Sequence, residues 1–271
     1  MTPERIVAEA LAEDLGERGD ITSALLIPAD RRATARVVAR KAGVLAGRAA
    51  AEEVLRQTGV SGEWRAKDGA RLTPDTVVVE IEGPARAVLT AERTLLNLLC
   101  HLSGIATLTA AYVAECGAVQ VLDTRKTTPG LRALEKAAVL AGGGVNHRMG
   151  LYDRVLVKDN HLALAGAGLV EAVARARREM PDVLVEVEAD DLAGVRLGLE
   201  AGADWVLLDN MTPDEMRAAV ALTAGRARLE ASGGMTLEGA RAAAGTGVDA
   251  VSVGALTHSA PALDLGLDID V

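Results

Sequence analysis

The 271-residue sequence is poor in aromatic side chains and carries no excess of positive charge. It contains no Phe, two Trp and two Tyr, so the core must be built from Ala, Val, Leu and Ile. Basic residues number 29 against 38 acidic ones, which gives a formal net charge of −9. Nucleic-acid sites need a basic face for phosphates and, for single strands, aromatic rings for stacking. These shortages argue against nucleic acid as the main partner.

Cysteines and membrane signals are equally scarce. The two cysteines, Cys100 and Cys116, lack metal-ligand spacing and are expected to be reduced thiols. No apolar stretch is expected to reach the roughly 20 residues of a membrane helix. Six of the first twenty residues are acidic, whereas a secretory signal would be basic and then apolar there. The sequence therefore predicts a cytoplasmic globular protein with no membrane partner.

The first hundred residues predict a small domain of mixed helices and strands. Residues 34–39 and 77–81 are rich in Val and Ala and read as strands, whereas residues 48–57 read as a helix. A long helix is expected over residues 87–114, with a break near Ser103-Gly104.

The rest of the chain has a different sequence pattern, in which short apolar runs alternate with helical stretches. The six runs cover residues 119–123, 154–158, 183–188, 204–209, 228–232 and 250–254. Alternating strands and helices predict parallel strands with right-handed crossovers. An eight-unit barrel typically takes about 250 residues, and this segment is much shorter. We therefore expect a reduced α/β barrel of about six strands, with a doubly wound sheet as the alternative.

Ionisable and small residues stand at the carboxyl ends of these runs, where barrel enzymes keep their catalytic groups. The run ends are Asp123, Lys158, Glu188, Asp209, Ser232 and Gly254. Residues 123–161 also carry seven basic against four acidic residues in an otherwise acidic chain. A solvated basic face is the simpler explanation of a charge run, but placement at successive strand ends favours an anion site. Small residues after the last two strands favour a phosphate site.

Seven motifs then carry a resemblance to a known family. They are AERTLLN at 91–97, DTRKTTPGLR at 123–132, GGGVNHRMGLYD at 142–153, KDNH at 158–161, EVE at 186–188, LDN at 208–210 and ASGG at 231–234. Together they span nearly the whole chain, in order, and the sequence resembles the quinolinate phosphoribosyltransferases.

The resemblance implies a fold and a reaction. The fold would be an N-terminal α/β sandwich at 1–104, an incomplete barrel at 105–258, and a segment at 259–271 that returns to the first domain. The reaction would convert quinolinate and phosphoribosyl pyrophosphate, with Mg²⁺, into nicotinate mononucleotide, pyrophosphate and CO₂ in NAD biosynthesis. The family works as a homodimer or an assembly of dimers.

The resemblance also implies roles for particular residues. The catalytic positions correspond to Lys126, Glu188 and Asp209, and the last two would hold Mg²⁺, partly through substrate and water. Quinolinate-binding positions correspond to Arg93 from the neighbouring subunit and to Arg125, His147, Arg148 and Lys158. Phosphoribosyl and phosphate positions correspond to Thr124, Lys126, Ser232, Gly233, Gly234, Ser252, Val253 and Gly254.

Two other functions remain open from the sequence. One is a related pyrophosphorylase associated with molybdenum-transport operons. The other is a barrel that binds a sugar phosphate without catalysis. His147-Arg148 favours the quinolinate enzyme, because these groups suit a second carboxylate.

Overall fold

The computed structural model describes residues 1–270, which divide into two compact units. The first unit comprises Met1–Ala110, Thr127–Gly143 and the C-terminal segment from Leu256. The second comprises Ala111–Lys126 and Gly144–Ala255. The predicted domain boundaries at residues 104 and 258 stay predictions, and each unit is described by itself below.

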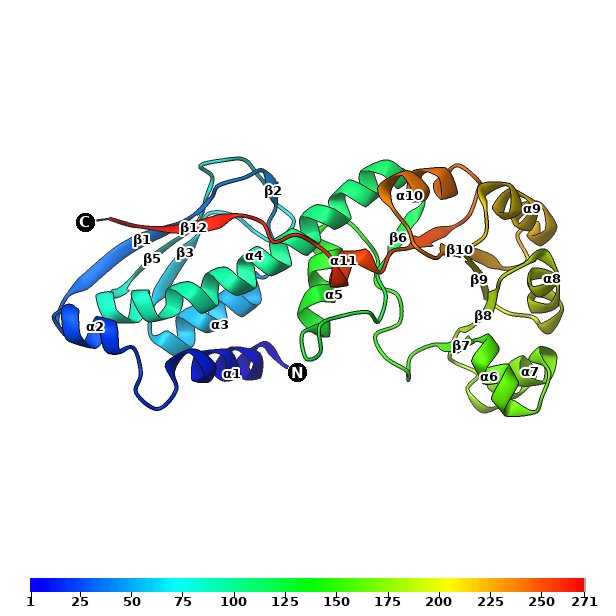
Figure 1. The fold of residues 1–271 in the computed structure, drawn as a ribbon, viewed down its shortest axis with the longest axis horizontal. Coiled ribbons are helices and arrows are strands. Elements are labelled where there is room, and N and C mark those ends of the chain that lie inside the picture. Colours follow the sequence, from blue (N-terminus) through cyan, green and yellow to red (C-terminus); the bar gives the residue numbers. More distant parts are fainter. Residues whose placement is uncertain (271) are drawn as a thin grey trace. The chain divides into compact units, whose positions relative to one another are not determined.

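A four-stranded antiparallel sheet forms the centre of the first unit, in the order β12-β1-β5-β3 (Figure 1). Its strands are β1 (Arg32–Ala39), β3 (Ser61–Trp64), β5 (Val77–Pro84) and β12 (Leu265–Asp270). The last strand of the chain pairs with β1 from Thr34↔Asp270 to Ala39↔Leu265. A separate two-stranded sheet joins β2 (Gly43–Val44) to β4 (Arg71–Leu72). The first and last strands of the chain, β1 and β12, are therefore neighbours in one sheet.

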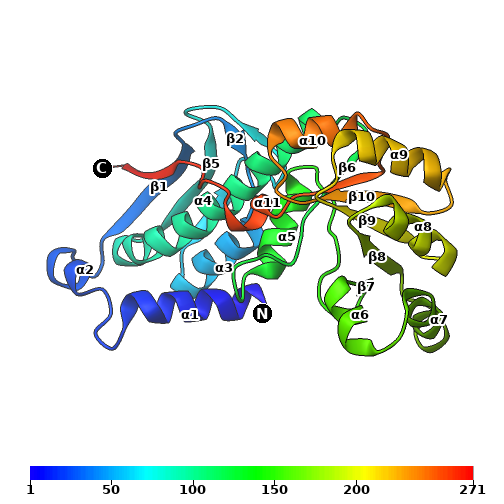
Figure 2. The same ribbon diagram turned by 45° about the vertical axis from the view of Figure 1, so that its right-hand side comes forward.

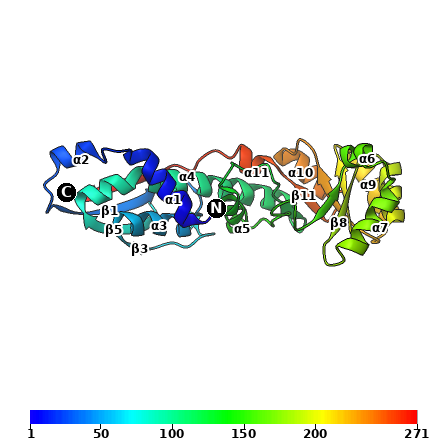
Figure 3. The same ribbon diagram turned by 90° about the horizontal axis from the view of Figure 1, so that it is seen from below.

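Helices complete this unit, and α1 packs against α3 (Figure 3). The helices are α1 (Pro3–Leu15), α2 (Ile21–Leu26), α3 (Arg48–Thr58), α5 (Arg132–Ala141) and the short α11 (Ala255–His258), which starts at the last residue of the second unit. The inward residues of α1 are Ile6, Val7 and Leu11, whose 3.6-residue spacing gives the helix one apolar face.

The longest helix, α4 (Ala85–Cys116), is continuous, so the predicted break near Ser103-Gly104 is wrong. Tertiary packing explains why these poor helix formers are tolerated. The Ser103 hydroxyl accepts the Ala46 N–H at 3.0 Å. A Cβ on Gly104 would lie 2.2 Å from the Pro261 carbonyl oxygen, so only glycine lets the C-terminal segment pass this close.

By length and composition α4 is also apolar enough to cross a membrane, contrary to the sequence-based expectation. Within its most apolar 18-residue window, 61% is buried inside the protein. Side chains such as Leu95, Leu99 and Ile105 have no exposed surface. This burial is that of a core helix.

Six parallel strands form the second unit, in the order β6-β11-β10-β9-β8-β7 (Figure 2). The strands are β6 (Gln120–Leu122), β7 (Val155–Val157), β8 (Val185–Ala189), β9 (Trp205–Asp209), β10 (Arg228–Ser232) and β11 (Ala250–Ser252). All six predicted runs are strands. From β7 to β11 each strand pairs with the next in sequence, and β6 then pairs with β11. This is the cyclic order of a barrel opened between β6 and β7, and a doubly wound sheet would reverse its order at a switch point. The predicted fold class is confirmed.

The helices of this unit follow the strands (Figures 1 and 2). They are α6 (Asp159–Ala165), α7 (Leu169–Glu179), α8 (Leu192–Ala201), α9 (Pro213–Thr223) and α10 (Leu237–Ala244). The starts of α8, α9 and α10 are set by side-chain caps that follow the strands. Asp191 accepts the Gly194 N–H at 2.7 Å, and Thr212 forms a capping box with Glu215.

Candidate active site

A cavity of about 530 Å³ lies at the carboxyl ends of the six strands. Thirteen of the predicted site residues line it: Thr124, Arg125, Lys126, His147, Arg148, Lys158, Glu188, Asp209, Ser232, Gly233, Gly234, Ser252 and Gly254. The strand ends that the sequence singled out are therefore brought together in one place.

Two predicted site residues lie elsewhere. Val253 is fully buried, and its backbone N–H donates to the Leu122 carbonyl at 2.9 Å, so it joins β11 to β6. Arg93 belongs to the other unit, where its side chain is exposed on α4. Their proposed roles stay predictions.

A larger cavity, of about 980 Å³, opens at the amino ends of the same strands. Its charged groups are mostly engaged within the protein: Arg177 pairs with Asp204 at 2.9 Å, and Arg228 lies over the Trp205 ring at 5.5 Å. In α/β barrels catalysis takes place at the carboxyl ends, and the amino ends contribute to stability. We therefore assign the active site to the smaller cavity.

Two guanidinium groups dominate one side of this cavity. Burial lowers the pKa of Arg148, and the nearby charge of Arg125 lowers it further. The Arg148 guanidinium donates to the Arg154 carbonyl oxygen at 3.4 Å. Two half-buried cations this close repel each other, and an anion between them would relieve that repulsion.

Carboxylates stand at the ends of β8 and β9. Glu188 is ion-paired with Lys158, the residue that follows β7. Asp209 accepts the side-chain N–H of Asn210 at 2.8 Å. Carboxylate oxygens at adjacent strand ends are the ligands that Mg²⁺ prefers. The donor set fits such an ion.

The loop after β10 approaches Asn210 too closely for any side chain. Gly233 has φ of +101°, and a Cβ there would lie 2.1 Å from the Asn210 side-chain oxygen. The Asn210 N–H donates to the Ser232 carbonyl at 3.0 Å, so the two strand ends are tied together. A loop of small residues lets a phosphate approach the backbone N–H groups.

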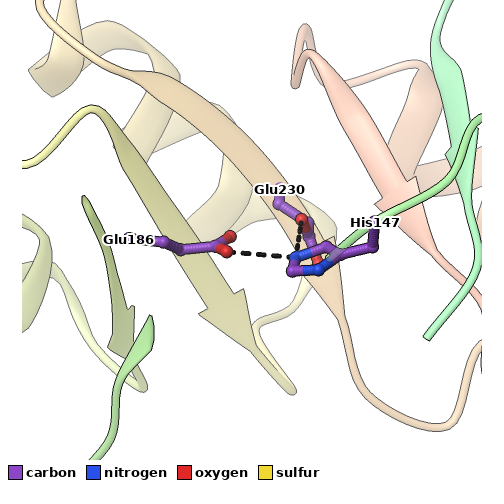
Figure 4. A group of neighbouring side chains, drawn as sticks. All are labelled: His147, Glu186 and Glu230. Carbon is purple, nitrogen blue, oxygen red and sulfur yellow. Dashed lines mark hydrogen bonds and ion pairs between the residues drawn. The ribbon is translucent and has the colours of Figure 1, made fainter. Parts of the chain in front are cut away.

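Beneath the cavity lies a buried cluster that the sequence analysis did not identify (Figure 4). His147 Nε2 lies 3.0 Å from Glu186 Oε2 and 3.3 Å from Glu230 Oε2. The Arg154 guanidinium lies 3.2 Å from the same Glu186 oxygen. The signal in the sequence was a glutamate inside two of the six apolar runs. Glu186 lies on the same strand face as Glu188, and Glu230 on the same face as Ser232.

The cluster shifts the protonation of its members. Burial lowers the pKa of His147, but the two glutamates outweigh this and raise it to about 9. Burial also acts to raise the pKa of Glu186, yet His147 and Arg154 hold it below its usual value. Burial raises the pKa of Glu230. The pKa of each member is therefore set by its neighbours as well as by burial.

The fold and site together define an α/β-barrel enzyme for an anionic, phosphorylated substrate. Sequence comparison makes this specific. The quinolinate phosphoribosyl transferase C-terminal domain matches residues 105–268, and the N-terminal domain of the same family matches residues 20–103. The chain belongs to the quinolinate phosphoribosyltransferase family, which confirms the resemblance seen in its motifs.

Individual relatives agree. The chain is 46% identical to a carboxylating nicotinate-nucleotide pyrophosphorylase of Mycobacterium leprae, over 97% of this chain and 95% of that one. A probable enzyme of the same name from Bacillus subtilis is 42% identical, over 98% and 93% of the two chains. The solved nicotinate-nucleotide pyrophosphorylase of Francisella tularensis superposes with a TM-score of 0.93 at 39% identity, over 99% and 96%.

Proposed function

We propose that the protein catalyses decarboxylating phosphoribosyl transfer. Quinolinate and phosphoribosyl pyrophosphate would give nicotinate mononucleotide, pyrophosphate and CO₂, a step of NAD biosynthesis. The observation that carries the proposal is the convergence of guanidinium groups, two carboxylates and a glycine loop on one cavity of about 530 Å³. Family membership supports the same reaction.

The basic wall suits quinolinate, which is a dianion. Arg125 and Arg148 would each take a carboxylate through the guanidinium fork, and Lys158 would add a point charge. The lowered pKa of Arg148 supports this role, because a dianion would relieve the repulsion that causes part of the shift.

The acidic strand ends suit the activated ribose. Glu188 and Asp209 would hold Mg²⁺, which on binding would neutralise charge on the pyrophosphate. Lys126 and Thr124 would contact the phosphoribosyl group, and the loop at 232–234 would receive its phosphate.

The reaction needs orientation and charge more than covalent catalysis. The ring nitrogen of quinolinate would form a bond to the anomeric carbon as the bond to pyrophosphate breaks. The carboxylates of Glu188 and Asp209 would stabilise the positive charge that develops on the ribose. The ring nitrogen then becomes cationic and stabilises the electron pair left when CO₂ departs, and a proton added at that carbon completes the product.

The direct test supplies the purified protein with Mg²⁺, phosphoribosyl pyrophosphate and quinolinate. Equal amounts of pyrophosphate and nicotinate mononucleotide are expected. Binding of phosphoribosyl pyrophosphate without release of pyrophosphate would instead indicate a sugar-phosphate sensor. Trapping of a covalent adduct at Lys158 by borohydride would contradict the non-covalent mechanism.

We further propose a cytoplasmic homodimer in which Arg93 of the partner subunit completes the quinolinate site. Support comes from the exposure of Arg93 on α4 and from its place in the family motif at 91–97. Arg93→Ala and Lys126→Ala are each expected to be inactive, whereas mixed dimers of the two would regain activity at one of their two sites. Absence of this complementation would place Arg93 in the site of its own subunit.

A further inference from the structure

The interior of the barrel contains two carboxylates where apolar side chains would be expected. Glu186 on β8 is fully buried and Glu230 on β10 is 1% exposed. Burying a carboxylate costs several kcal/mol unless it is paired and hydrogen-bonded. Glu186 contacts the His147 ring and the Arg154 guanidinium, and His147 Nε2 also lies 3.3 Å from Glu230. The two glutamates are therefore built around one histidine.

A metal ion is a poor explanation for this cluster. His147, Glu186 and Glu230 do offer three ligand atoms within 4.8 Å of one another (Figure 4). However, the Arg154 guanidinium lies 3.2 Å from both His147 Nε2 and Glu186 Oε2. A divalent cation would face this fixed positive charge at short range. The guanidinium already supplies the charge that a metal would bring.

The imidazole of His147 is held on both sides. Its Nε2 faces the two glutamates, while its Nδ1 lies 2.6 Å from the backbone nitrogen of Arg148. A ring nitrogen accepts an N–H only while it carries no proton. This contact therefore leaves the ring proton on Nε2, which faces the two glutamates, and it favours the neutral ring against the rise in pKa that the glutamates cause.

Further hydrogen bonds connect His147 to the wall of the cavity. The backbone N–H of His147 donates to Asp123 Oδ1 at 2.9 Å, which fixes the backbone before Arg148. The Arg148 guanidinium donates to the Arg154 carbonyl. Two-pronged recognition of a carboxylate depends on guanidinium orientation, and a shift of about 1 Å in a reacting group can reduce the rate about 100-fold.

We propose that Glu186 and Glu230 are positioning residues of the pyridine-diacid site. They orient the His147 ring so that its Nδ1 accepts the Arg148 N–H, and this contact fixes Arg148 in the cavity wall. His147 thus acts through Arg148 instead of donating to the substrate. The identity of the substrate rests on the proposed function, but the contacts that orient the His147 ring do not depend on it.

Kinetics of four variants test the proposal. Glu230→Gln keeps the size and the hydrogen-bonding atoms of the side chain and should stay within about threefold of the parent, whereas Glu230→Met removes those atoms and should raise the KM for quinolinate about tenfold or more. Glu186→Gln breaks the ion pair with Arg154 and should have a larger effect than Glu230→Gln. The KM for phosphoribosyl pyrophosphate should change less than twofold throughout. Glu53→Gln, at a buried glutamate of the first unit that pairs with the exposed Arg56, is the matched control and should change neither KM.

Nitrogen-15 spectra of the histidine rings provide a readout that does not depend on activity. The chain has four histidines, so His147 can be assigned by comparison with His147→Gln. We expect a ring protonated at Nε2 alone in the parent and in Glu230→Gln, and a different proton distribution in Glu230→Met. A fully protonated ring in the parent, or a ring unchanged in Glu230→Met, would overturn the proposal. So would one equivalent of tightly bound transition metal in the purified protein.

The failures of the two proposals can be distinguished. An inactive parent enzyme whose His147 ring has the expected protonation would refute the quinolinate reaction and leave the hold on the ring standing. An active parent enzyme whose KM for quinolinate is equally insensitive to Glu230→Met and Glu230→Gln would refute the positioning role alone.

Discussion

Replacing Glu188 by Gln should tighten quinolinate binding while slowing the reaction. In the structure Glu188 is ion-paired with Lys158, so the negative charge of one offsets the positive charge of the other. A dianion that binds near Lys158 must share it with this carboxylate. The substitution keeps the shape of the side chain and removes only its charge.

The expected magnitude follows from the exposure of the pair. Lys158 is 39% exposed and Glu188 is 17% exposed, so solvent screens much of their attraction. Ion pairs of this kind contribute about 0.2–1 kcal/mol, and 1 kcal/mol corresponds to about a fivefold change in affinity. The dissociation constant for quinolinate should therefore fall by a factor of about 1.4 to 5. Loss of one electrostatic group at the reacting centre typically lowers kcat by about 10²–10³.

Titration calorimetry of quinolinate against the free enzyme, with single-turnover kinetics, measures the two effects separately. Glu238→Gln is the control, because Glu238 is an exposed glutamate of the same unit and its loss changes the net charge equally. If Glu188→Gln binds quinolinate more weakly than the parent, then Lys158 and Glu188 do not compete for the ligand. If kcat is unchanged, Glu188 does not act on the ribose.

Three further predictions concern particular contacts. Gly233→Ala should raise the KM for phosphoribosyl pyrophosphate about tenfold or more, because its Cβ would meet Asn210. Gly234→Ala meets no atom within 4 Å and has only the strain of its φ of +43°, so it should change the KM less. Gly104→Ala should lower the stability by about 1–3 kcal/mol, seen as a lower Tm, whereas Gly168→Ala, with no atom within 4 Å, should leave Tm unchanged. Burial acts to raise the pKa of Asp204, but the Val185 N–H and Arg177 outweigh it and lower the pKa. The contribution of Asp204 to stability should therefore be present above about pH 4 and lost as the pH falls further. The free energy of unfolding of Asp204→Asn, measured by urea titration, should fall less below this pH than that of the parent.

The sequence predicted the second unit better than the first. Each barrel strand is a short apolar run that ends in a polar or glycine residue, so periodicity located all six strands and their ends. The continuity of α4 could not be predicted in this way. It depends on contacts of Ser103 and Gly104 with Ala46 and Pro261, which lie far away in the sequence.

The residues at the strand ends of the site were predicted, whereas the buried glutamates Glu186 and Glu230 were missed. Residues at strand ends, such as Lys158 and Asp209, stand out because they terminate apolar runs. Glu186 and Glu230 lie inside those runs, where an isolated charge does not reveal its partner. Only the register of β8 and β10 brings both carboxylates to His147, which is on neither strand.

The like charges of Arg125 and Arg148, and not cavity size, set the cavity at the carboxyl ends apart from the one at the amino ends. At the amino ends, Arg177 and Arg154 are neutralised by carboxylates, so the larger cavity offers little attraction to an anion. At the carboxyl ends, Arg148 is half-buried beside Arg125, and its pKa is lowered because both burial and its neighbour disfavour the charged form. Groups held in such an arrangement gain most when a doubly charged ligand arrives. Glu186 fits the same logic, because it neutralises Arg154 and holds His147 but does not line the cavity that receives the substrate.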